Sequence, residues 1–111
     1  MKDKHQWIQA DLGVPHLLES VTTLGRLGRY RQWVKSYYIS YSHDRMNWVN
    51  IPTLYSGNVD QDTEKTNNLP PNIVARYVRL RPNTWNQAIA MRWEVAGCSG
   101  KLALSYHSNT E

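Results

Sequence analysis

The sequence has 111 residues, which is enough for one small domain with a modest hydrophobic core. No apolar run approaches the ~20 residues of a membrane-spanning helix, and the first residues lack the apolar stretch of a signal peptide. The formal net charge of +4 favours anionic partners, but only weakly, because a charge of this size also serves solubility.

The first quarter of the chain predicts two strands after a polar N-terminal extension at residues 1–6. Residues 7–12 alternate between apolar and polar side chains, the pattern of a half-buried strand, and we expect Gly13 and Pro15 to end it. Residues 17–24 predict a second strand rather than a helix, because the segment is short and contains β-branched residues.

The middle of the chain predicts a loop, a hairpin and a polar connection. Residues 25–33 hold two glycines and three arginines without periodicity, which indicates a loop. Residues 34–51 are typical of a hairpin whose turn is built around Asp44, a residue that readily bonds nearby backbone N–H groups. Residues 52–68 are polar and rich in turn formers, so we expect a long connection there.

The last third predicts two further strands. Residues 89–96 alternate cleanly, with Ile89, Met91, Trp93 and Val95 on one face. The run 74–81 places Val74, Val78 and Leu80 on one face, and Pro82 is expected to end it, leaving Trp85 in the connection. We expect the tail, 99–111, to be mostly unstructured. Short strands separated by turns indicate an all-β, antiparallel sandwich or barrel.

An ordered series of short motifs resembles the discoidin family, also called the coagulation factor V/VIII type C domain. The motifs are WIQADLG at 7–13, TLGR at 23–26, QWVKSYYISYSHD at 32–44, SGNVDQDT at 56–63, ARYVRLRP at 75–82, IAMRWEV at 89–95 and a closing Gly97-Cys98. The resemblance implies a distorted jelly-roll barrel related to the galactose-binding-domain fold. It implies a domain at 7–98, followed by the tail.

The resemblance also has a departure at the N-terminal side. In the family the closing cysteine usually bonds a cysteine at the start of the domain. Cys98 is the single cysteine here, and the family's opening section before Trp7 is missing. We therefore expect an N-terminally truncated domain with an exposed sheet edge, prone to strand pairing or aggregation.

The loop at residues 26–31 is the first candidate ligand site. Leu27 and Tyr30 lie among Arg26, Arg29 and Arg31. Apolar tips ringed by guanidinium groups suit an anionic membrane surface, and arginine also grips sulfate or carboxylate groups. In membrane-binding discoidin domains the corresponding loop carries an apolar tip. The resemblance therefore implies a ligand-binding tip at residues 26–31. The alternative is a solvated loop without a ligand.

Two further candidates lie in the last third. Trp85 offers an aromatic platform for a sugar ring. Arg92 matches a family arginine that lies near the binding face or supports it. The arginines at 76, 79, 81 and 92 are also explained as structural residues paired with acidic side chains or backbone carbonyls. Tryptophan and tyrosine side chains of the hairpin are explained by core packing, so we expect no nucleic-acid ligand.

Residues 56–63 place oxygen-bearing side chains at alternating positions, which makes Asn58, Asp60 and Asp62 a weak candidate for Ca²⁺. The competing interpretation is a loop whose side chains bond their own backbone, and this interpretation is favoured. No other cofactor or metal is expected. The four histidines are scattered and no nucleophile, zinc or phosphate-loop motif is present, so we expect no enzyme activity.

These observations lead to one main hypothesis and two alternatives. The main one is a non-catalytic extracellular module for cell adhesion, with loop tips that bind anionic lipid headgroups, glycans or cell-surface and matrix proteins at the membrane periphery. The extracellular location follows from the resemblance alone. The alternatives are a lectin-like, carbohydrate-binding domain and a structural fragment that functions within a larger protein.

Overall fold

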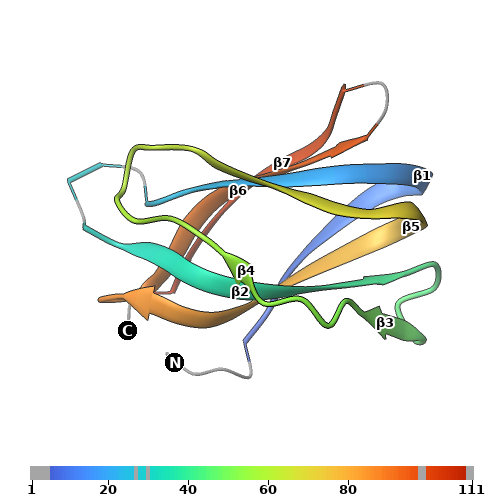
Figure 1. Cartoon of the computed structure of the whole chain (residues 1–111), viewed down its shortest axis with the longest axis horizontal. Coiled ribbons are helices and arrows are strands. Elements are labelled where there is room, and N and C mark those ends of the chain that lie inside the picture. The colour runs from blue at the N-terminus through green and yellow to red at the C-terminus, as the bar shows by residue number, and fades with distance from the viewer. Residues whose placement is uncertain (1–5, 27, 30, 98–99, 110–111) are drawn as a thin grey trace.

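The computed structural model describes residues 6–26, 28, 29, 31–97 and, for the backbone, 100–109. These residues form seven strands of one antiparallel sheet in the order β3-β2-β5-β1-β6-β7, with β4 paired to β2 (Figure 1). The strands are β1 (Ile8–Leu24), β2 (Trp33–Ser42), β3 (Trp48–Asn50), β4 (Tyr55–Ser56), β5 (Lys65–Asn86), β6 (Ile89–Gly97) and β7 (Gly100–Asn109). The described part contains no helix long and apolar enough to cross a membrane.

The sheet folds onto itself in two layers because its two longest strands bend. In Figure 1, β1 and β5 both turn back at the same end of the molecule. Residues 8–11 of β1 pair with residues 77–80 of β5, which also pair with β2. Residues 18–23 of β1 pair with residues 65–73 of β5 on one side and, together with Leu24, with β6 on the other. The all-β, antiparallel sandwich predicted from the sequence is confirmed.

The bend in β1 corrects one sequence prediction. We expected Gly13 and Pro15 to separate two strands, but β1 continues through both. Gly13 adopts a positive φ of 85°, and the pairing with β5 shifts between Asp11 and His16. Glycine adopts this conformation at no steric cost, so the residue bends the strand rather than ending it.

The long strand β5 corrects three more predictions. The strand begins at Lys65, inside the segment expected to be a connection, and it passes through Pro82, which pairs with Tyr37. Trp85 therefore belongs to the strand and pairs with Val34. The turn is shorter than expected because Gln87, at a positive φ of 65°, reverses the chain almost immediately before β6.

The core lies between the two layers and follows the predicted alternation in β6, where Ile89, Met91, Trp93 and Val95 are all buried. The prediction for β5 is wrong in its first half. Val74 is 43% exposed while Ala75 and Tyr77 are buried; the pattern then changes phase at Val78. A single alternation cannot describe a strand that changes layers along its length.

The tail also differs from its prediction. Gly100–Asn109 forms β7 and pairs with β6 along almost its whole length, from Gly97↔Gly100 to Ile89↔Asn109. The weak alternation of this segment carries little signal by itself. The neighbouring strand β6 supplies the backbone partners that an isolated polar segment lacks.

Candidate ligand-binding site

Two loops lie together at the end of the sandwich opposite the bends in β1 and β5 (Figure 1). Loop 25–32 connects β1 to β2, and loop 57–64 connects β4 to β5. The backbone N–H of Gly25 donates to the carbonyl oxygen of Gln61 at 3.0 Å. The side-chain amide of Gln61 donates in turn to the carbonyl oxygens of Arg26 and Gly28. The loops therefore form one unit, which we call the paired loops.

Arg92 reaches the paired loops from β6. Its Nε donates to the carbonyl oxygen of Gly25 at 2.8 Å, and one terminal nitrogen donates to that of Gln61 at 3.3 Å. A guanidinium group has its donors in a fixed fork, so one side chain binds both loops in a defined relative position. Arg92 therefore has a structural role, in which it bonds backbone carbonyls. This is one of the two roles that the sequence analysis left open.

The three arginines of loop 25–32 take different positions. Arg26 is half-buried, and one terminal nitrogen donates to Gln32 Oε1 at 2.8 Å within the loop. Arg29 and Arg31 are exposed. The guanidinium carbon of Arg31 lies 5.9 Å from the ring centroid of Trp33. The two remaining candidates of this loop, Leu27 and Tyr30, lie outside the described residues.

Loop 57–64 supplies an apolar tip that the sequence analysis did not single out. Val59 is 84% exposed in the paired loops. The only signal in the sequence was one apolar residue inside a polar segment, which by itself has no specific meaning. Its significance comes from its place in a loop that is bonded to the loop with the exposed arginines.

The three residues proposed for Ca²⁺ are used differently. Asn58 is buried, and its amide donates to the carbonyl oxygens of Thr23 and Thr63. Asp60 accepts from the backbone N–H groups of Asp62 and Thr63 and from the Thr63 hydroxyl. The bonds from Thr63 are the main cause that holds the pKa of Asp60 below its ordinary value. Within the described residues no three metal-ligating side chains gather. The loop has the self-bonded geometry that the sequence favoured.

Trp85 lies on β5 rather than in a loop, half-buried and packed against the core. The edge left accessible lines a cavity of about 330 Å³ together with Lys35, Asn83 and Thr84. A second cavity of about 470 Å³ begins on the other side of Lys35 and extends to Val59 and Asn86. Cys98 lies outside the described residues.

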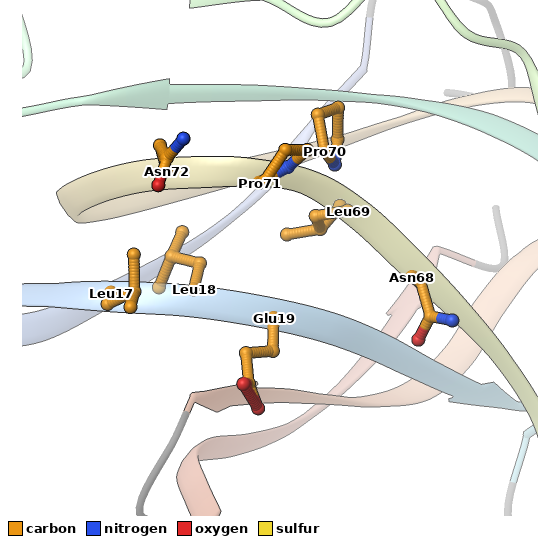
Figure 2. A pocket seen from close by; sticks show the side chains of 8 residues that line it. All are labelled: Leu17, Leu18, Glu19, Asn68, Leu69, Pro70, Pro71 and Asn72. Atoms are coloured by element: carbon orange, nitrogen blue, oxygen red, sulfur yellow. The ribbon is translucent and has the colours of Figure 1, made fainter.

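A third cavity, of about 450 Å³, lies at the opposite end of the molecule between β1 and β5. Figure 2 shows the residues that line it, among them Leu17, Leu69 and two adjacent prolines. Glu19 is the one charged residue in this lining, and no lysine or arginine contributes. The one charge in this lining is negative and does not attract an anionic ligand, whereas the paired loops carry three arginines together with Asp60, Asp62 and Glu64.

Two arginines of β5, Arg79 and Arg76, contact side chains from other segments of the chain. The guanidinium of Arg79 lies between the rings of Trp7 and Trp48, 4.0 Å and 3.9 Å from their centroids. Arg76 forms an ion pair with Asp11, with Nε 2.8 Å from Oδ1. These contacts join distant segments of the chain, and they correspond to the structural interpretation of the basic set.

The two folded layers and their loop-bearing end define the molecule as an antiparallel β-sandwich of the jelly-roll type. The family model of the F5/8 type C domain matches residues 1–95, so the chain belongs to this family, the discoidin domains. The resemblance deduced from the motif series is confirmed.

Relatives and solved structures agree with this assignment. The chain is 34% identical over 108 residues to Discoidin, CUB and LCCL domain-containing protein 2 of Rattus norvegicus, covering 90% of this chain and 14% of that protein. It is 33% identical to Retinoschisin of Mus musculus, covering 92% and 48%. Discoidin II of Dictyostelium discoideum superposes with a TM-score of 0.80 at 33% identity, covering 98% and 42%. The chain spans less than half the length of each of these three proteins.

Proposed function

We propose that this domain is a non-catalytic recognition module that binds anionic phospholipid surfaces through the paired loops. Membership of the discoidin family supports recognition rather than catalysis as the class of function. The observation that carries the proposal is that Val59, Arg29 and Arg31 are all exposed on two loops that are bonded to each other. Such a module acts outside the cell, at the surface of a membrane.

The chemistry follows from the two kinds of side chain. Lysine or arginine near an anionic leaflet contributes about 1 kcal/mol of attraction, and an apolar tip adds burial at the boundary of the acyl chains. Arg29 and Arg31 supply the first contribution and Val59 the second. The bonds from Arg92 and Gln61 hold the loop backbones in place before contact, so less conformational entropy is lost on binding.

Co-sedimentation with phosphatidylserine-containing and neutral phosphatidylcholine vesicles, at low and physiological salt, tests the proposal. Arg29→Gln and Arg31→Gln should each weaken binding to the anionic vesicles about fivefold. Arg45→Gln removes the same charge from the β2–β3 turn, at the other end of the sandwich, and should leave binding nearly unchanged.

The apolar contribution has a closely matched control. Val59 and Met46 are both 84% exposed, but Met46 lies in the β2–β3 turn. Val59→Ser should weaken binding at physiological salt, where charge attraction between exposed groups is screened, while Met46→Ser should not. Equal effects of the two serine variants, or equal binding to neutral and anionic vesicles, would reject the paired loops as the membrane-binding surface.

A further inference from the structure

The outer face of the layer formed by β1, β5 and β2 carries two guanidinium groups that have no carboxylate partner. Arg79 and Arg81 lie two residues apart on β5, on the side away from the core. Residues that share a face of a strand in this way are about 7 Å apart. Arg76 is paired with Asp11, but among the described residues no aspartate or glutamate forms an ion pair with Arg79 or Arg81.

Arg79 is held in place from both sides. Trp7 precedes β1 and Trp48 begins β3, and their ring centroids lie 4.0 Å and 3.9 Å from its guanidinium carbon. Its Nε donates to Gln9 Oε1 at 3.0 Å, while its two terminal nitrogens donate to no group in the described part of the chain. Burial lowers the pKa of Arg79, because surroundings of low polarity disfavour the charged form. This guanidinium is therefore positioned, partly desolvated and without a counter-charge.

Arg81 has an unused donor of its own. Its guanidinium carbon lies 5.4 Å from the ring centroid of Tyr38, the residue with which it pairs across β2 and β5. The Nε atom is buried, and no described residue accepts its hydrogen. Buried N–H groups without an acceptor are rare and cost free energy, so an acceptor brought by a partner would stabilise this site.

The carboxylates that contact this face are already bonded. Asp11 accepts from Arg76, and Asp44 accepts from backbone N–H groups of its own turn. Arg45, from the same turn, adds a further guanidinium 5.3 Å from the ring centroid of Tyr77. The charge of the face is therefore positive, and it complements an acidic partner.

The residue types of this face are those that supply most of the binding energy in protein interfaces, namely tryptophan, tyrosine and arginine. Their contacts with one another fix the side chains in advance, so little conformational entropy is lost on binding. We name the surface formed by Trp7, Tyr38, Trp48, Arg79 and Arg81 the arginine–tryptophan face.

We propose that the arginine–tryptophan face docks an acidic segment of a partner protein in extended conformation. Carboxylates two residues apart in such a segment are also about 7 Å apart, so one can bond the terminal nitrogens of Arg79 while the next bonds Arg81. A guanidinium group and a carboxylate can form two parallel hydrogen bonds, which is the geometry that selects this partner chemistry. None of the residues of the face belongs to the paired loops.

Calorimetric titration of the whole chain at physiological salt with three blocked peptides of equal length tests the proposal. Glutamate alternates with threonine in the first peptide. The second has the same composition with its glutamates adjacent, and the third has glutamine in place of every glutamate. The first should bind most tightly and the third should not bind. Arg81→Gln should weaken binding of the first peptide about tenfold.

Arg31→Gln is the matched control. Arg31 also lies over an aromatic ring, 5.9 Å from the centroid of Trp33, but it belongs to the paired loops. This variant should leave peptide binding nearly unchanged and weaken binding to anionic vesicles, whereas Arg81→Gln should do the reverse. The failure of peptide docking and the failure of lipid binding are therefore distinguishable.

A second measurement uses the unmodified chain. The NMR resonance of the Arg79 Nε–H group, which is bonded to Gln9, should shift when the first peptide is added. Equal losses in the two arginine variants, equal binding of the first and second peptides, no binding of the first peptide, or an unchanged Arg79 resonance would each overturn the proposal. A heparin tetrasaccharide that binds more tightly than the first peptide and depends on Arg81 would also overturn it, by assigning the face to anionic glycans.

Discussion

The Nε atom of Arg92 lies 2.8 Å from the carbonyl oxygen of Gly25, and this contact joins the centre of β6 to the first residue after β1. The same guanidinium reaches the carbonyl oxygen of Gln61. A residue on a regular strand thus determines the relative position of two loops that are 36 residues apart in sequence at these points. The predicted basic set thus contains this positioning residue, whereas the exposed arginines that it supports indirectly, Arg29 and Arg31, belong to the candidate loop at residues 26–31.

Arg92→Met should destabilise the fold by about 1–3 kcal/mol, because two backbone carbonyls lose a charged donor while the length of the side chain is retained. Urea unfolding measures this loss. Arg29→Met removes the same charge from an exposed position and serves as the control, with an effect within about 0.5 kcal/mol. If both variants unfold at the same urea concentration, the contacts of Arg92 do not hold the paired loops.

Asp44 should make the stability of the domain depend on acid pH. Backbone N–H groups of Asn47 and Met46 donate to its carboxylate at 2.9 Å and hold its pKa well below the ordinary value of 3.8. A lowered pKa in the folded state means that the contribution is complete above the pKa of the unfolded chain and is lost as pH falls towards the folded value.

Urea unfolding at a series of pH values between 6 and 2 measures the effect. In Asp44→Asn the free energy of unfolding should be lower at pH 6, and its decline below about pH 4 should be shallower than in the unmodified protein. Glu19→Gln, at an exposed position on β1, is the control and should leave the curve unchanged. A decline below pH 4 of the same steepness in Asp44→Asn would contradict this role of the turn.

Leu80 tests where the core lies. It is fully buried on β5 and pairs with Ile8 on one side and Ile39 on the other. Leu80→Ala should cost about 2–5 kcal/mol, through lost burial and the cavity left behind. Val59→Ala, at an 84% exposed position, should change stability by less than about 0.5 kcal/mol. Thermal unfolding compares the two, and a small effect at Leu80 would place it outside the core.

Alanine at Gly57 and alanine at Gly13 should both lower the stability of the domain, but for different physical reasons. At Gly57 the new Cβ would meet the Val34 carbonyl oxygen at 2.5 Å, and Gly57→Ala should cost about 1–3 kcal/mol or more through overpacking. At Gly13 nothing lies within 4 Å, but φ is 85°, so Gly13→Ala should cost about 1–2 kcal/mol of backbone strain.

Ligand binding distinguishes overpacking at Gly57 from backbone strain at Gly13, because only Gly57 lies in the paired loops. Gly57→Ala should also weaken binding to anionic vesicles, because it displaces loop 57–64 and with it Val59. Gly13 lies within β1, 12 residues before the first residue of loop 25–32, so Gly13→Ala should not change binding. Equal binding losses in the two variants at temperatures where both are folded would indicate a general loss of structure.

The sequence predicts the class of fold, the hairpin around Asp44 and the buried face of β6, because each depends on local alternation or turn chemistry. It fails at Gly13 and Pro82, where the tertiary structure continues a strand through residues that usually end one. It also fails for Gly100–Asn109, whose partner strand is the source of its order. Of the candidate site, the exposed arginines are visible in the sequence, whereas the contribution of Val59 depends on two loops that meet only in the folded chain.

The bends in β1 and β5 have a consequence for how the domain unfolds. Each of these strands contributes its first part to one layer and its second part to the other, so neither layer can detach without breaking pairs in both. The two layers should therefore be lost in one cooperative transition, without a half-folded state that retains the loops. Ligand binding at the loop-bearing end then stabilises the whole sandwich, and a shift in its melting temperature reports on occupancy of the paired loops.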